Sequence, residues 1–477
     1  MFIPLDRRSP TPLWQQLMAH IIREIDSGHL KAGEPLPPSR ALALELGLSR
    51  STVQTAYEEL IARGYLRAAR RAGTRVIAGN RNPDPNMGIR HTGELAQSPQ
   101  FAQIEAAMKQ WLAINEGVEA EIDFRHQEPL VDDRFRAAWR KAMLRAWDAA
   151  EAPDLSYTSS QGHEKLRSAV CHYLRQARGI HVAPEQVMIT CGAQHAIDLV
   201  AQALLSPGVT AAVEDPGFPG ARLPLLFRGI NVVGVPVDEQ GVVVQAIPND
   251  ARLVFVTPSH QRPTGAIMTV ERRRELIRFA RESGAWVIED DFDGEFRYQG
   301  GPLPTLHSDS PECVLYLLAF SKLLVPGIRL AVLAGYAHVI KRIAAIQSLI
   351  QRHVPIVEQL TLCEFITQGE FAKHVQRLRK VYRNRHRALM RALREHGFDE
   401  RFRIQGAEAG LHVFLEAEPG FDEMEALRRA AAVGVGLYPL TPYTMTSRRK
   451  GLLLGFARTD EVSIAEGIRR LKSSGFV

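Results

Sequence analysis

The 477-residue sequence predicts an α/β protein in which a mostly parallel sheet with helices on both faces follows a small helical unit. Three observations predict it. From about residue 121 onward, β-branched runs (QVMIT, TAAVED, RLVFVTPS, AWVIEDD, VLYLLAF) alternate with helical patterns, as is typical of parallel sheets. Residues 1–78 instead show three helical patterns and a hairpin pattern. Between them, GNRNPDPNMGIRHTGELAQSPQ is rich in Pro, Gly and Asn and has no apolar periodicity, which is typical of a flexible linker.

The composition excludes several classes of protein. With 45% hydrophobic and 23% charged residues, the chain has an ordinary soluble composition, and no apolar run approaches the roughly 20 residues that span a membrane. The N-terminus shows no signal-peptide pattern, so we expect a cytoplasmic protein without a membrane partner. The four cysteines form no CxxC pair, so the sequence predicts neither a disulfide framework nor a metal site.

Three segments of the first eighty residues have the apolar spacing of helices: Trp14–Asp26, Arg40–Leu46 and Thr52–Arg63. We expect Ser39 to cap the second helix and Ser49 the third, because a side-chain oxygen at the N-cap accepts a hydrogen bond from a free backbone amide. Gly47 lies in the short connection between these helices. This layout predicts a helix-turn-helix, whose second helix enters the major groove of DNA.

Two β-like segments, YLRAAR and GTRVIA, flank a turn that ends at Gly73 and predict a hairpin wing. Residues 61–80 contain five arginines and no acid, and residues 1–80 carry a net charge of +4 out of +6 for the whole chain. Such a surface favours a polyanion, because each neutralised phosphate releases counterions. The alternative is a basic face that only keeps a helical unit in solution.

The stretch LPPSRALALELGLSRSTVQTAYEELIARGYL, followed by GTRV, closely resembles the winged helix-turn-helix of the GntR regulators over about residues 10–77. That family typically has Ser-Ser-Arg where this chain has Pro38-Ser39-Arg40, so the arginine is kept. The resemblance implies binding to a double-stranded DNA operator. The implied contacts are Arg40, Arg50, Thr52 and the wing around Gly73.

In a parallel sheet, ligands bind at the carboxyl ends of the strands, so the loops after the β-branched runs are the candidate site. Gly192 follows QVMIT and opens a helix whose free amides suit a phosphate, although a packing turn explains it equally well. Phe218 follows TAAVED in a Pro/Gly-rich loop, where it can stack on a planar ligand; taken alone, a core aromatic is the commoner case.

Two further strand ends carry charges. AWVIEDD ends in Glu289, Asp290 and Asp291, which need partners because burying an unpaired carboxylate is costly. The apolar run LLAFSKLLVPGIRL contains Lys322 and Arg329. A lysine in such a run either extends its ammonium group to water or is kept dry so that its neutral amine can react.

These side chains match the needs of pyridoxal 5′-phosphate. This cofactor requires an amine for a Schiff base, an anion beside its pyridine nitrogen and a cationic, amide-lined cup for its phosphate. Lys322 would provide the amine and Asp290 the anion. The phosphate cup would consist of Arg329 and the amides after Gly192. Arginine suits phosphate because its planar fork donates two parallel hydrogen bonds. Lys322 would then lie among apolar residues because a desolvated amine loses its proton more readily.

Five stretches match the MocR regulators in sequence order: YTSSQGHEKLRSAV, VEDPGFPGAR, TPSHQRPTGAIMTVERR, EDDFDGEFRY and FSKLLVPGIRL. Residues 120–477 accordingly resemble the fold-type I, pyridoxal-phosphate-dependent aminotransferases. The chain then divides into a winged helix-turn-helix at 1–78, a linker at 79–119 with an amphipathic segment at 101–114, and this aminotransferase-like domain.

The resemblance implies a role for each candidate residue. Lys322 is the Schiff-base lysine, Asp290 the partner of the pyridine nitrogen, Arg329 a phosphate ligand and Phe218 the stacking ring. Tyr157 would contact the phosphate across a homodimer interface, with a surface or core tyrosine as the alternative. Further implied cofactor-binding positions are Ser321, Gly192 and Ala193.

The chain departs from the family pattern at four positions of this site. Phe292 stands where the family has Tyr and Arg262 where related aminotransferases have Asn, so two hydrogen bonds to the cofactor's 3′-oxygen are lost. Ala193 and Ala319 replace hydroxyl residues of the phosphate cup. Each lost hydrogen bond is typically worth about 0.5–1.5 kcal/mol, so cofactor affinity falls unless other side chains compensate. Candidates for compensation are Arg262, Ser321 and His195.

The sequence leaves three functions open. The first is a transcriptional regulator that binds DNA and senses a small amino compound, or the cofactor itself, through an aldimine at Lys322. The second is a regulator whose aminotransferase-like domain is a scaffold for dimerisation that binds the cofactor weakly or not at all. The third is a working aminotransferase, against which Phe292 argues. We expect a homodimer, since paired winged helices suit repeated half-sites. Arg449 and Arg458 are candidates for holding an effector carboxylate.

Overall fold

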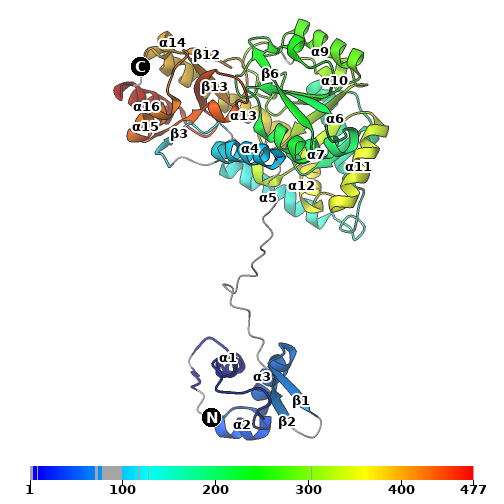
Figure 1. Cartoon of the computed structure of the whole chain (residues 1–477), viewed down its shortest axis with the longest axis vertical. Coiled ribbons are helices and arrows are strands. Elements are labelled where there is room, and N and C mark those ends of the chain that lie inside the picture. The colour runs from blue at the N-terminus through cyan, green and yellow to red at the C-terminus, as the bar shows by residue number, and fades with distance from the viewer. Residues whose placement is uncertain are drawn as a thin grey trace. The chain divides into compact units, whose positions relative to one another are not determined.

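The computed structural model describes residues 4–7, 9–69, 73–77, 99–115, 119–126, 128–301 and 303–475. The chain forms two compact units, residues 1–97 and 98–477, which we describe one at a time (Figure 1). Most of the predicted linker, residues 79–98, lies outside the described residues, as do Arg70 and Arg71 of the predicted wing. No helix within the described ranges is long and apolar enough to cross a membrane.

Three helices and a two-stranded hairpin form the first unit: α1 (Leu13–Asp26), α2 (Ser39–Leu46), α3 (Arg50–Ala62), β1 (Leu66–Ala69) and β2 (Gly73–Val76). The apolar sides of the helices meet in one core, in which Leu17, Leu42 and Val53 are fully buried. The hairpin strands pair antiparallel, with Leu66 opposite Val76. The three predicted helices and the predicted hairpin are therefore confirmed.

The two capping predictions differ in outcome. The hydroxyl of Ser49 accepts a hydrogen bond from the backbone amide of Thr52, so Ser49 caps α3 as predicted. The predicted cap at Ser39 is wrong, because Ser39 is already the first helical residue and the N-cap is Pro38, which has no side-chain acceptor. Gly47 ends α2 with a φ of 60°, a left-handed conformation that glycine adopts without strain.

An eight-stranded sheet forms the centre of the second unit, in the order β4-β11-β10-β9-β8-β5-β6-β7. Its strands are β4 (Val187–Thr190), β5 (Thr210–Asp215), β6 (Asn231–Asp238), β7 (Gly241–Val242), β8 (Ala251–Val256), β9 (Trp286–Asp290), β10 (Val314–Ala319) and β11 (Ala331–Ala334). The strands from β10 to β6 are parallel, whereas β11 and β7 run antiparallel to their neighbours. All five β-branched runs form strands, which confirms the mostly parallel sheet.

Helices cover both faces of this sheet (Figure 1). One face carries α7 (Ala193–Leu204), α8 (Pro219–Phe227) and α11 (Ala337–Gln351), and the other carries α6 (Glu164–Arg178), α9 (Val270–Ser283) and α10 (Leu306–Asp309). Successive side chains of a strand point to opposite faces. Accordingly, Leu253 and Phe255 of β8 pack toward α7, whereas Val254 packs toward α9.

The remaining elements surround the sheet. They are α4 (Pro99–Asn115), β3 (Ile122–Asp123), α5 (Asp133–Asp148), α12 (Ile356–Thr367), α13 (Glu370–Glu395), α14 (Phe398–Arg401), β12 (Arg403–Gln405), β13 (His412–Ala417), α15 (Glu423–Ala432), β14 (Val435–Gly436), β15 (Tyr438–Pro439), β16 (Lys450–Gly455) and α16 (Glu461–Ser473). Strands β12, β13, β16 and β15 form an antiparallel sheet in that order, and β3 pairs with β14. The predicted amphipathic segment is helical, since it forms α4, which packs against α8.

Candidate functional site

The carboxyl ends of β4, β5, β9 and β10 meet around one cavity of about 240 Å³. Seven of the residues predicted to bind the cofactor line it: Gly192, Ala193, Phe218, Asp290, Ser321, Lys322 and Arg329. Each lies at or just after the end of a strand, where ligands of parallel sheets bind, or in the turn that follows. The sheet topology thus brings together side chains from four separate motifs.

Tyr157 does not line this cavity. The residue is 76% exposed, and the guanidinium carbon of Arg352 lies 4.5 Å from the centroid of its ring. Within one chain it is a surface tyrosine, and its role across a homodimer interface stays a prediction.

Lys322 follows β10, a strand whose side chains are all buried, and is itself only 8% exposed. Burial first, and then the positive charge of Arg262, lower the pKa of Lys322 to about 7. A large fraction of the amine is therefore neutral near pH 7. A neutral amine is the form that attacks an aldehyde.

Two of the three carboxylates at the end of β9 are already partnered. Glu289 accepts hydrogen bonds from two backbone amides of α10, each at 3.0 Å. Asp291 is ion-paired with Arg178 and accepts a hydrogen bond of 2.5 Å from the hydroxyl of Tyr316. These contacts supply the partners that buried acids require.

Asp290 is the third carboxylate, and it alone of the three lines the cavity. It is the last residue of β9 and lies opposite Leu317 in the parallel pairing with β10. Its Oδ1 atom is buried and has no hydrogen-bond partner in the described parts of the chain. Burial raises the pKa of Asp290 to about 8. This carboxyl group is therefore available to a ligand that offers a hydrogen-bond donor or a positive charge.

Gly192 and Arg329 form the opposite end of the cavity. Gly192 is the N-cap of α7, with a φ of 85°, and a Cβ atom added to it would lie 2.9 Å from a guanidinium nitrogen of Arg329. That guanidinium also donates a hydrogen bond of 3.1 Å to the carbonyl of Cys191. The free amides at the start of α7 and the arginine thus point to one place, which suits an anion such as a phosphate.

Aromatic rings form one wall of the cavity. Phe218 is the N-cap of α8, and Trp111 of α4 packs edge-on against it with 5.7 Å between ring centroids. The guanidinium carbon of Arg262 lies 4.5 Å from the centroid of Phe218 and 5.6 Å from that of Phe292. Sequence reasoning missed Trp111, whose only signal was the amphipathic pattern of its helix, and it also missed Arg125 and Glu128, which have no motif around them.

Other predicted residues have different surroundings. Ala319 lines the cavity without offering a hydrogen bond. The Nδ1 atom of His195 accepts a hydrogen bond of 3.0 Å from the backbone amide of Cys191, so this nitrogen is engaged in the turn before α7. Arg449 is paired with Glu416 at 2.6 Å.

Arg458 is paired with Glu128 at 2.6 Å and is about half exposed. Neither Arg449 nor Arg458 lines the cavity.

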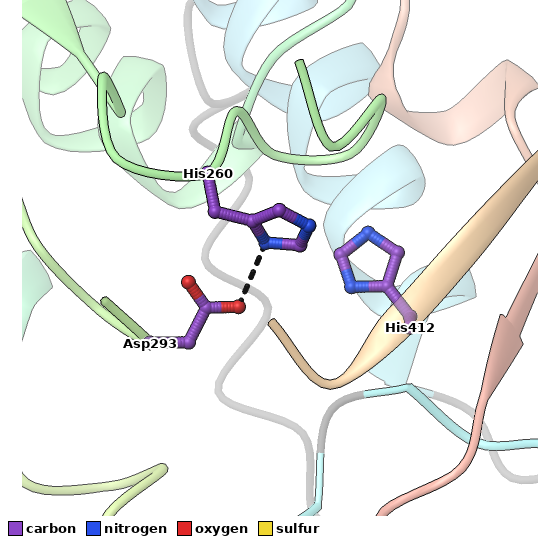
Figure 2. Close-up of side chains that lie close together, drawn as sticks. All are labelled: His260, Asp293 and His412. Atoms are coloured by element: carbon purple, nitrogen blue, oxygen red, sulfur yellow. Dashed lines mark hydrogen bonds and ion pairs between the residues drawn. The ribbon is translucent and has the colours of Figure 1, made fainter. Parts of the chain in front are cut away.

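A buried cluster of two histidines and an aspartate joins the loop that carries Arg262 to neighbouring segments. His260 Nδ1 and Asp293 Oδ2 are hydrogen-bonded at 2.9 Å, and the ring of His412 lies 5.1 Å from that of His260 (Figure 2). Ligand atoms of the three side chains lie within 4.8 Å of one another, a spacing that could hold a metal ion. His412 also donates from Nε2 to the carbonyl of Pro263 at 2.8 Å. These hydrogen bonds fix the position of the loop that carries Arg262.

Two family models match the chain. The model of bacterial regulatory proteins of the gntR family matches residues 13–76, and the model of aminotransferases of class I and II matches residues 122–471. The HTH-type transcriptional regulator YdeL of Bacillus subtilis is 36% identical, and the match covers 98% of each chain. The probable rhizopine catabolism regulatory protein MocR of Rhizobium meliloti is 31% identical, over 98% of this chain and 95% of that one.

A solved structure resembles the second unit. It is LysN, an α-aminoadipate aminotransferase of Thermus thermophilus, complexed with N-(5′-phosphopyridoxyl)-L-leucine. The TM-score is 0.69 at 27% sequence identity, and the match covers 80% of this chain and 97% of that one.

Proposed function

Because the chain belongs to the MocR-like transcriptional regulators of the GntR family, which join a GntR helix-turn-helix to an aminotransferase-like domain, we propose that it binds pyridoxal 5′-phosphate through Lys322. In this proposal the second unit senses a small amino compound, or the cofactor itself, and alters DNA binding by the first. Residues 1–78 contact the operator, residues 120–477 form the sensor, and residues 79–119 connect these two domains. The observation that carries the proposal is the meeting of Lys322, Asp290 and Arg329 in one cavity.

The DNA contacts that we propose lie on the accessible side of the first unit. Arg50 and Thr52 begin α3, the second helix of the helix-turn-helix, and Arg40 lies in the first turn of α2. Arg40 and Arg50 are exposed and make no ion pair with any described residue. Gly73 opens β2 with a φ of 74° and pairs with Ala69, the last residue of β1. Cations free of internal partners are suited to bind phosphate groups.

The residues of the cavity fit the cofactor. When bound, pyridoxal 5′-phosphate supplies an aldehyde that reacts with amines and a pyridine ring that draws electrons. Lys322, with a pKa of about 7, provides an amine that is partly neutral near pH 7, and Asp290, with a pKa of about 8, holds a proton that it can share with the ring nitrogen. Arg329 and the amides after Gly192 bind the phosphate. Phe218 stacks on the ring, and Ser321 and Ala193 complete the lining.

The second candidate function, a scaffold that binds the cofactor weakly, is favoured by the same cavity. Phe292, Ala193 and Ala319 all line it and offer no side-chain hydrogen bond where hydroxyl groups would strengthen binding. Turnover as an aminotransferase is the least supported, because it needs the ring contacts that Phe292 has lost. The proposed homodimer would bring Tyr157 of one chain to the phosphate of the other, and the exposure of Tyr157 is compatible with this role.

Two measurements test the proposal. An electrophoretic shift with DNA from upstream of the chain's own gene, with and without pyridoxal 5′-phosphate, tests operator binding and its control by the cofactor. Visible absorption of the purified protein with added cofactor, compared with the Lys322→Ala variant, tests the covalent contact. A cofactor-independent shift together with an identical spectrum for both proteins would leave the scaffold as the better account.

A further inference from the structure

The cavity contains three arginines, and two of them are already hydrogen-bonded. Arg125 pairs with Asp123 at 3.2 Å and with Glu128 at 3.0 Å. Arg329 donates to the carbonyl of Cys191. The guanidinium of Arg262, in contrast, makes no hydrogen bond or ion pair with any residue that the structure describes.

The side chain of Arg262 is nevertheless buried, with an exposed fraction of only 7% for the residue. Its guanidinium lies over the rings of Phe218 and Phe292. Aromatic faces attract the positive charge but satisfy few of the five N–H donors of the group. None of its guanidinium nitrogens is among the fully buried atoms that lack a hydrogen-bond partner, so these N–H donors reach the open space of the cavity, where an oxyanion can accept from them.

Several hydrogen bonds fix the loop that holds Arg262. The side-chain nitrogen of Gln261 donates to Glu214 at 3.0 Å and to the carbonyl of Pro216 at 2.9 Å. The backbone amide of Arg262 donates to Thr257 Oγ1 at 3.0 Å. His412 Nε2 donates to the carbonyl of Pro263 at 2.8 Å. His260 of the same loop is hydrogen-bonded to Asp293 (Figure 2). A rigid loop that presents a free guanidinium is preorganised for a ligand.

We propose that Arg262 is the oxyanion receptor of this cavity, and this proposal rests on the proposed function. Its planar fork would bind either the phenolate oxygen of pyridoxal 5′-phosphate or the carboxylate of an amino-acid effector, with two parallel N–H donors. Sequence reasoning offered Arg449 and Arg458 for the carboxylate, but Arg449 is paired with Glu416, Arg458 is paired with Glu128, and neither arginine lines the cavity. If the carboxylate is the ligand, the effector is an amine that carries an acidic group, and simple amines are discriminated against.

The experiment uses full-length protein and the variants Arg262→Gln and Arg262→Lys, with Arg458→Gln as the variant of the competing candidate for the effector carboxylate. Calorimetry measures the affinity for pyridoxal 5′-phosphate. Spectral titration of the cofactor-loaded protein then compares L-alanine with ethylamine, which have the same amine but differ in the carboxylate. Loss of a charge-assisted contact lowers affinity by about tenfold or more.

Two results support the proposal and identify the oxyanion. If Arg262→Gln binds the cofactor about tenfold more weakly, Arg262 binds the phenolate of the cofactor. If Arg262→Gln binds the cofactor normally but loses the preference for L-alanine over ethylamine, Arg262 binds the carboxylate of the effector. In either case we expect Arg262→Lys to fall between wild type and Arg262→Gln, and Arg458→Gln to match wild type. The proposal is overturned if Arg262→Gln retains both properties within about twofold, or if Arg458→Gln loses the preference instead.

Failure of the proposed function gives a different pattern. The cofactor calorimetry is repeated in the Lys322→Ala background, where no covalent contact can form. If cofactor binding is the same there as in wild type and no visible band forms in either, the Lys322 part of the proposed function is wrong. In that case calorimetric titrations with the cofactor and with L-alanine still decide the role of Arg262, because they measure whether Arg262→Gln loses affinity for either ligand.

Discussion

Lys322 and Asp290 face the same buried cavity from neighbouring parallel strands. Asp290 ends β9 and pairs in register with Leu317 of β10, and Lys322 follows the end of β10. Burial shifts both groups toward neutrality, since it lowers the pKa of the amine to about 7 and raises that of the carboxyl to about 8. The pair is therefore suited to a ligand that needs a neutral amine at one atom and a proton at another.

The lowered pKa of Lys322 predicts the pH dependence of its reaction with pyridoxal 5′-phosphate. Because only the neutral amine attacks, the rate should rise with pH and reach half its maximum near pH 7. Stopped-flow absorption between pH 5 and 10 measures it. A midpoint near the ordinary lysine value of 10.5 would show that the amine is solvated, contrary to its burial in the structure.

Asp290→Asn should change the stability of the cofactor-free protein in a pH-dependent way. The folded pKa of about 8 lies above the ordinary 3.8, so the carboxyl contributes stability below pH 3.8 that is lost as the pH rises through 8. Urea unfolding at pH 8.5 should therefore show the variant to be more stable than wild type by roughly 2–5 kcal/mol. At the same time its cofactor affinity should fall.

Asp291→Asn is the matched control and should act in the opposite direction. Asp291 is paired with Arg178 and Tyr316, so its replacement leaves a buried guanidinium without its counter-charge. We expect a loss of about 3 kcal/mol or more in the free energy of unfolding. Equal effects of the two substitutions would contradict the different environments that the structure gives these adjacent acids.

Sequence patterns predicted the site residues at the ends of strands, because local motifs set those positions. They did not show which acid of Glu289, Asp290 and Asp291 is unpartnered, since that depends on Arg178 and on the amides of α10, which are distant in sequence. The parallel strands were predictable from their β-branched runs. The antiparallel sheet of β12, β13, β16 and β15 was not, because its short apolar runs fit a buried helix equally well.

Trp111 shows the same limit. Its helix was predictable from the spacing of apolar residues, but the edge-on contact with Phe218 is a tertiary contact without a local signal. Ser39 failed as a cap for a local reason instead: the proline before it takes the N-cap position, and the helix begins one residue earlier than the pattern suggested.

Gly192→Ala should weaken phosphate binding. The new Cβ would lie 2.9 Å from the guanidinium of Arg329, and the φ of 85° would be strained. Gly208→Ala is the matched control, since its φ is 86° but nothing lies within 4 Å of the added atom. Both variants should lose about 1–3 kcal/mol of stability from backbone strain. Only Gly192→Ala should lose affinity for the cofactor in calorimetry; an equal loss in both would argue against a phosphate cup at this position.

Arg50→Ala should weaken binding to operator DNA and lower the salt dependence. If Arg50 contacts one phosphate, the slope of log affinity against log salt should decrease by about 1. Arg23→Ala on α1 is the control, because Arg23 is exposed and bonds within its own helix. Fluorescence anisotropy at several salt concentrations measures both. An unchanged slope for Arg50→Ala, or an equal change for Arg23→Ala, would move the contact surface away from α3.

Reductive trapping tests the central claim most directly. Full-length protein is incubated with pyridoxal 5′-phosphate, reduced with borohydride and digested, and the modified peptide is identified by mass spectrometry. The account predicts one stoichiometric modification, on Lys322, that is absent from the Lys322→Ala variant. Modification spread over surface lysines, or none on Lys322 at saturating cofactor, would contradict it.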